Sequence, residues 1–123
     1  MTGPGTIPTI DVTEAERRLR EDPERPVLLD VREVNEFLEV RAQGALLIPT
    51  SSFVARLGEL PADRPLLVVC HLGNRSAAVV GYLARMGRTD AANVAGGMDA
   101  WVRAGLPVRR GPLEAGEGDL AGS

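Results

Sequence analysis

Short apolar runs alternate with amphipathic segments along most of the chain. Residues 27–31 (VLLDV) and 66–70 (LLVVC) are nearly continuous apolar runs, typical of strands covered on both faces. Three shorter runs predict further strands at 6–12, 45–49 and 91–95. The intervening segments predict helices, which fall at 14–21, 32–39, 50–60, 74–87 and 96–105.

Two local patterns add detail to these helices. Thr13 and Glu16 have the spacing of a capping box, which predicts that the first helix starts beside them. Within 74–87, Val79, Leu83 and Met86 recur at helical spacing, so we expect them to share one buried face.

Strands that alternate with helices form βα units. The predicted fold is therefore α/β, with a mostly parallel central sheet of about five strands and helices on both faces. Residues 1–108 are predicted to form a single domain. From residue 111 onward the chain is small, acidic and nearly without apolar anchors, so 109–123 is predicted to be a disordered C-terminal tail.

Composition narrows the possible functions. The formal net charge is −3 and no basic stripe is interleaved with aromatic residues, which argues against nucleic-acid binding. One cysteine excludes an intramolecular disulfide and a zinc site built from several thiolates. The chain has no apolar run of membrane-spanning length and no signal-peptide pattern at its start. We therefore expect a cytoplasmic protein with a free thiol.

That thiol, Cys70, ends a predicted strand and is followed by a short polar loop (HLGNR) and a helix. Ligands of open parallel sheets bind beyond the carboxyl ends of the strands. Unpaired amides at the helix start, the helix dipole and the charge of Arg75 all favour an anion there, and Gly73 permits a tight turn. Such surroundings lower the pKa of a cysteine. A buried, inert thiol is the alternative, but the coincidence of these features favours a nucleophile.

Several segments resemble one family. VVCHLGNRSA resembles the active-site loop of single-domain rhodaneses, which are sulfurtransferases whose cysteine carries sulfur as a persulfide. LLDVREVNEF is similar to the family's Asp-Val-Arg-Glu signature, and GALLIP to the strand that follows it. AGGMDAWVRAGLPV is similar to the closing Gly-Gly-x-x-Ala-Trp segment. The resemblance covers roughly residues 7–108, and separated motifs in the right order are more specific than one loop.

This resemblance implies a rhodanese-like fold and a thiosulfate sulfurtransferase activity. A small anionic donor such as thiosulfate would pass sulfur to Cys70, and cyanide, a thiol or a partner protein would accept it. The loop amides would stabilise the persulfide charge, and Arg75 would attract the donor. The resemblance implies no metal and no organic cofactor. The charge and the hydropathy of the chain give no reason to expect a nucleic-acid or membrane partner. The implied substrate-binding residues are His71, Leu72, Gly73, Asn74, Arg75 and Ser76.

Asp30, Arg32 and His71 are further candidates at the same edge of the sheet. Asp30 and Arg32 follow the second strand and are predicted to support the site, more as an ion pair that fixes the chain than as groups in contact with substrate. His71 is interpreted as an exposed rim residue whose charge tunes anion entry, because an ionised thiol needs no base.

Two other functions stay open: a non-enzymatic rhodanese-like module that binds a partner or senses oxidants, and a cysteine phosphatase. Four residues separate Cys70 from Arg75, whereas five separate the two residues in phosphatases, and the smaller ring suits a sulfur atom. The chain also departs from the family pattern at 40–45 (VRAQGA). Arg41 stands where a histidine is usual and Ala95 where an acidic residue is common, which puts the local packing and the donor preference in question.

Overall fold

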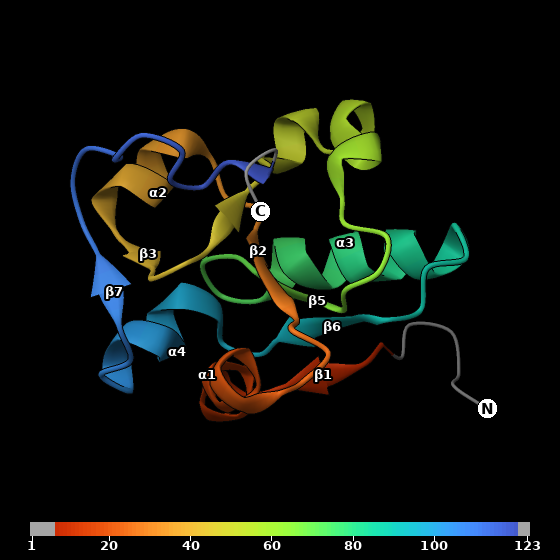
Figure 1. The fold of residues 1–123 in the computed structure, drawn as a ribbon, viewed down its shortest axis with the longest axis horizontal. Coiled ribbons are helices and arrows are strands. Elements are labelled where there is room, and N and C mark those ends of the chain that lie inside the picture. The colour runs from red at the N-terminus through yellow and green to blue at the C-terminus, as the bar shows by residue number, and fades with distance from the viewer. Residues whose placement is uncertain (1–6, 121–123) are drawn as a thin grey trace.

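Five parallel strands form the central sheet of the computed structural model, which describes residues 7–120 (Figure 1). Their spatial order is β1-β6-β5-β2-β4, and every neighbouring pair is parallel. The strands are β1 (Thr9–Ile10), β2 (Val27–Asp30), β4 (Leu46–Leu47), β5 (Leu66–Val69) and β6 (Ala91–Val94). β5 lies at the centre, so its carboxyl end opens between two neighbouring strands.

Helices cover both faces of this sheet. They are α1 (Val12–Glu21), α2 (Val34–Glu39), α3 (Asn74–Arg85) and α4 (Gly97–Arg103), with two 3₁₀ helices, η1 (Thr50–Ser52) and η2 (Val54–Glu59). Figure 1 shows α3 on one side of β5 and β6, with α1 and α4 on the other. The predicted α/β architecture is confirmed.

Alternation along β5 assigns its side chains to two cores. Leu67 and Val69 belong to a buried cluster that includes residues of α1, α2 and α4. Leu66, Val68 and Cys70 belong to the cluster that includes residues of α3. Since successive side chains of a strand point to opposite faces, Cys70 points toward α3.

Two predictions about the ends of helices are wrong. Helix α1 is capped by Asp11, whose carboxylate accepts a hydrogen bond from Glu14 N at 2.8 Å, because the helix begins before the predicted Thr13–Glu16 box. Met86 is 64% exposed, since α3 ends at Arg85 and the chain turns away at Gly87, whose φ is +93°.

The segment 50–60 forms the 3₁₀ turns η1 and η2 in place of the predicted helix. Phe53 is its one fully buried residue, so it lacks the apolar stripe that stabilises an α-helix on a core. Thr6, the first residue of the predicted strand 6–12, lies outside the described residues.

A second, two-stranded sheet was not predicted. β3 (Arg41–Ala42) pairs antiparallel with β7 (Val108–Arg109), with Arg41 opposite Arg109. Since β7 spans residues 108 and 109, the chain runs without a break from the body into the segment predicted to be a tail.

Residues 109–120 correct the prediction of a disordered tail. Leu120 is only 5% exposed and lies in the α3-side core, while Leu47 N donates to Gly118 O at 2.9 Å, along the outer edge of β4. Glu117 pairs with the buried Arg41. One leucine and one well-placed carboxylate thus anchor a segment whose overall composition resembles that of a disordered chain. Residues 121–123 lie outside the described part.

Candidate active site

The thiol of Cys70 lies just beyond β5, in a ring of hydrogen-bond donors. Cys70 is 1% exposed, and its Sγ accepts from Gly73 N at 3.1 Å and from Ser76 Oγ at 3.2 Å. Burial on its own raises the pKa of this thiol. The Ser76 hydroxyl and the backbone amides of Ser76, Gly73 and Leu72 outweigh that effect, so the pKa lies below its ordinary value. The site therefore favours a negatively charged sulfur.

The loop conformation makes this convergence of amides possible. Gly73 immediately precedes α3 with φ +110°, a left-handed conformation that side chains disfavour. The turn brings the first amides of α3 to the sulfur, at the end of the helix where the dipole is positive. The sequence prediction placed the glycine, the helix start and the cysteine together, and the structure shows the same arrangement.

The amino-terminal end of α4 fixes the same loop from outside. Met98 N donates to Cys70 O at 2.7 Å, and Asp99 N donates to His71 O at 3.0 Å. Gly97 makes this approach possible: its φ is +58°, and a Cβ there would collide with both carbonyl oxygens. Nothing in the local sequence around Gly97 shows which segment of the chain approaches it.

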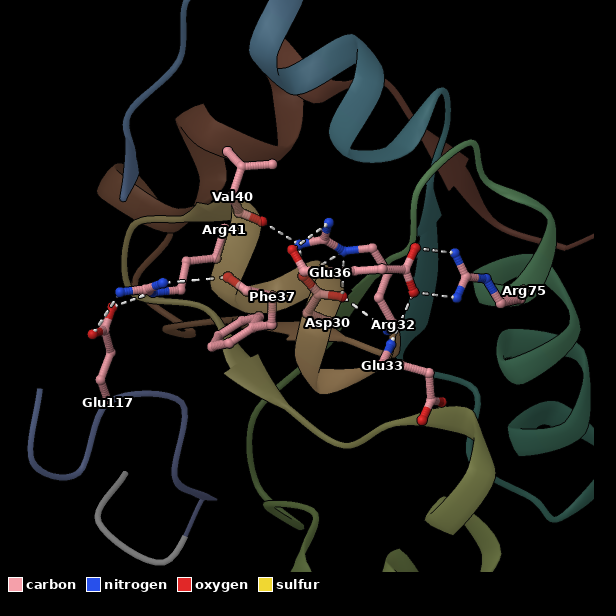
Figure 2. A network of polar contacts seen from close by, with 9 residues as sticks. All are labelled: Asp30, Arg32, Glu33, Glu36, Phe37, Val40, Arg41, Arg75 and Glu117. Carbon is pink, nitrogen blue, oxygen red and sulfur yellow. Dashed lines mark hydrogen bonds and ion pairs between the residues drawn. The ribbon is translucent and has the colours of Figure 1, made fainter. Parts of the chain in front are cut away.

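The predicted loop residues differ in their surroundings. His71, Leu72 and Asn74 are exposed, whereas Ser76 is fully buried beside the sulfur. Arg75 is half-buried and is held in an ion pair. Its Nη1 and Nη2 bind both carboxylate oxygens of Glu36 at 2.8 and 2.9 Å (Figure 2).

This ion pair balances the charge at the mouth of the site. The Arg75 guanidinium lowers the pKa of Glu36 to about 2, and it also interacts electrostatically with Cys70. Because Glu36 balances the charge of Arg75, the pair attracts an anion at the sulfur less strongly than the unpaired arginine expected from the sequence would. Nothing in the sequence pattern marked Glu36 as its partner, since the two residues are 39 positions apart.

Asp30 and Arg32 form the predicted ion pair. Both are buried, and Arg32 Nη2 lies 2.8 Å from Asp30 Oδ2 and 2.6 Å from Val40 O. Burial raises the pKa of Asp30, and the bonds from Arg32 oppose that rise. Figure 2 shows the Arg32 guanidinium turned toward Asp30 and Val40, so its contacts join the end of β2 to the end of α2.

Arg41, the departure from the family pattern, is also buried. Its side chain is 1% exposed, and it donates to Glu117 at 2.6 and 3.0 Å and to Gly111 O at 2.8 Å. It also lies 5.6 Å from the centre of the Phe37 ring. The unusual side chain therefore holds the segment 111–117 against the body.

Within residues 7–120 we find no group of three or more histidine, cysteine, aspartate or glutamate side chains placed to bind a metal. None of the helices in that range is long and apolar enough to span a membrane.

Fold and site together define an α/β domain with one buried cysteine, surrounded by hydrogen-bond donors, at the carboxyl edge of a parallel sheet. The family model for the rhodanese-like domain matches residues 11–104. The chain therefore belongs to the rhodanese-like family, as the resemblance in its motifs indicated.

Related proteins and solved structures support the same family. The chain is 38% identical over 85 residues to "Thiosulfate sulfurtransferase GlpE" of Actinobacillus succinogenes, covering 69% of this chain and 77% of that protein. It is 34% identical over 99 residues to "Sulfurtransferase" of Allochromatium vinosum, covering 80% and 92%. The crystal structure of a rhodanese-related protein from Thermoplasma volcanium superposes with a TM-score of 0.75 at 28% identity, covering 83% of this chain and 97% of that one.

Proposed function

We propose that this protein is a thiosulfate sulfurtransferase that works through a persulfide on Cys70. The observation that carries the proposal is the ring of donors about Sγ, formed by the Ser76 hydroxyl and loop amides. The names of the relatives, thiosulfate sulfurtransferase among them, support the same activity.

The reaction divides into two half-reactions. The Cys70 thiolate attacks the outer sulfur of thiosulfate, the S–S bond of the donor breaks, and sulfite leaves with the electron pair. The product is Cys70–S–S⁻, whose charge lies on the outer sulfur. Cyanide or a thiolate then attacks that outer sulfur and regenerates the Cys70 thiolate. Each step displaces a sulfur anion, and no external oxidant or reductant is required.

Loop amides stabilise the negative charge on both sides of this exchange, as in an oxyanion hole. Gly73 and the start of α3 supply them, while His71, Leu72 and Asn74 form the exposed rim that an incoming donor meets first. Arg75, held by Glu36, provides a fixed positive group beside that rim. Asp30 and Arg32 support the neighbouring chain.

The acceptor and the location belong to the same proposal. An exposed Leu72 (55%) beside the buried thiol supports an acceptor that reaches the loop from outside, such as a small thiol or a thiol carried on a protein. A cytoplasmic location is supported by the single free cysteine.

Turnover assays test the function directly. Thiosulfate and cyanide should yield thiocyanate with the wild-type protein and none with Cys70→Ser. An aryl phosphate should not be hydrolysed. If phosphate is released in a reaction that depends on Cys70 and no thiocyanate forms, the protein is a cysteine phosphatase and the proposal is wrong.

A further inference from the structure

The hydroxyl of Ser76 lies between two acceptors in the buried part of the site. Ser76 Oγ is 3.2 Å from Cys70 Sγ and 2.6 Å from Asn93 Oδ1. Exposures of these three residues are 0% for Ser76, 1% for Cys70 and 7% for Asn93, so water has little access to this group. The hydroxyl carries a single proton and can therefore donate to only one of the two acceptors at a time.

The position of Asn93 is fixed by the sheet. It lies on β6, where its register partners are Val68 on β5 and Thr9 on β1, and its backbone N donates to Pro8 O at 2.8 Å. A polar side chain in the middle of a buried four-residue strand needs a partner. Its Oδ1 finds that partner in Ser76, at a distance short enough to compete strongly with the sulfur.

We propose that Asn93 is a positioning residue for sulfur transfer, which controls whether the Ser76 hydroxyl donates to Cys70 Sγ. This inference rests on the proposed function. In the resting thiolate the charge is on Sγ, and the hydroxyl donates to it. In the persulfide the charge has moved to the outer sulfur, and the hydroxyl turns to Asn93 Oδ1. No covalent bond changes in Ser76 or Asn93.

The exchange matters because the two states of the enzyme differ in where the charge lies. A hydroxyl that always donated to Sγ would stabilise the thiolate alone and disfavour transfer of sulfur onto it. An alternative acceptor at 2.6 Å offsets the loss of that bond when the persulfide forms. Asn93 thereby brings the energies of the two states closer together.

Other charged groups near the thiol belong to different elements. Arg75 of α3 interacts electrostatically with Cys70 and with Asp30, the last residue of β2, and Glu36 of α2 pairs with Arg75. The exposed His71 belongs to the loop. The substitutions below leave all of these groups in place, so a change in the thiol can be assigned to the Ser76–Asn93 pair.

The test is a double-mutant cycle on the pKa of the thiol. Because the chain has one cysteine, ultraviolet absorbance of the thiolate reports Cys70 alone, with Cys70→Ser as the blank. Ser76→Ala should raise the pKa by about one unit, since a hydrogen bond to the charged form is lost. Asn93→Ala should lower it by about half a unit, because the freed hydroxyl donates to sulfur alone. The double variant should match Ser76→Ala.

Several outcomes overturn the proposal. The first is a pKa of the Cys70 thiol that is unchanged or raised in Asn93→Ala. The second is that Asn93→Ala shifts this pKa equally in the wild-type protein and in Ser76→Ala. If Asn93→Ala does not fold, Asn93→Leu keeps the branched shape and the number of side-chain heavy atoms without an acceptor, and the same prediction applies to it. A Val94→Ala variant, on the same strand but in the opposite core, controls for loosened packing. The pKa is measured without any sulfur donor, so failure of the proposed activity is detected separately, by loss of thiocyanate formation.

Discussion

The Arg41–Glu117 pair allows a sharp prediction about the carboxyl-terminal segment. In Glu117→Gln, one carboxylate oxygen becomes an amide NH₂ that faces the guanidinium and cannot accept from it. Arg41 is 1% exposed and loses its counter-charge, while keeping its bonds to Gly111 O and Phe37 O. Breaking a fully buried pair costs about 3–5 kcal/mol.

Glu117 is 16% exposed, so water replaces part of what is lost and the expected cost falls to about 2–3 kcal/mol. For a domain of this size that corresponds to a fall in melting temperature of roughly 10 °C. The matched control is Glu114→Gln, in the same segment and with the same change of charge. Glu114 is 73% exposed and pairs with Arg109 on the surface, so the melting temperature should move by no more than about 2 °C.

The stability that the Arg41–Glu117 pair contributes should depend on pH, in a direction set by the pKa of Glu117. Arg41 lowers the pKa of Glu117 to about 2. A depressed folded-state pKa contributes stability above the unfolded-state value, about 4.5, and that stability is lost as the pH falls toward 2. The gap in melting temperature between wild type and Glu117→Gln should therefore narrow over that window. Equal shifts in both glutamine variants, or a gap independent of pH, would refute the reasoning.

Three further results are expected. Gly97→Ala should lower the free energy of unfolding by at least about 2 kcal/mol and slow thiocyanate formation at least about tenfold, because the added Cβ collides with the loop carbonyls at a positive φ. The control is Gly81→Ala, at a helical site with room for a Cβ, which should be as stable as wild type or more stable. Similar melting curves for the two variants would contradict this prediction. Glu36→Gln should lower KM for thiosulfate, because the charge of Arg75 is no longer balanced, and the effect should shrink in high salt; an unchanged or raised KM would oppose it. Persulfide formation at fixed thiosulfate should slow as the pH falls through the depressed pKa of Cys70, and a rate independent of pH down to acid denaturation would count against a thiolate nucleophile.

Local pattern was sufficient for the elements that place the cysteine. The two buried runs ending at residues 31 and 70 became the neighbouring strands β2 and β5, and the loop from Cys70 to Ser76 has the predicted turn and helix start. These features depend on residues adjacent in the chain, whose spacing and type can be read directly from the sequence.

The partners of the site could not be predicted in the same way. Arg41 and Glu117 are 76 positions apart, Arg75 and Glu36 are 39 apart, and Ser76 and Asn93 are 17 apart. Each contact is made by the crossing of elements in three dimensions, and glutamates are too common on surfaces for any one of them to be singled out. Asn93 carried the one available signal, a polar residue inside an otherwise apolar predicted strand.

The central claim is that the amide ring holds a sulfur anion on Cys70, and trapping that state tests it most directly. The reduced protein is mixed with thiosulfate, freed of small molecules without an acceptor, and its intact mass is measured. Wild type should gain the mass of one sulfur atom and lose it on addition of cyanide, while Cys70→Ser gains nothing. A wild-type mass that never changes, or a gain that Cys70→Ser shares, would contradict the account.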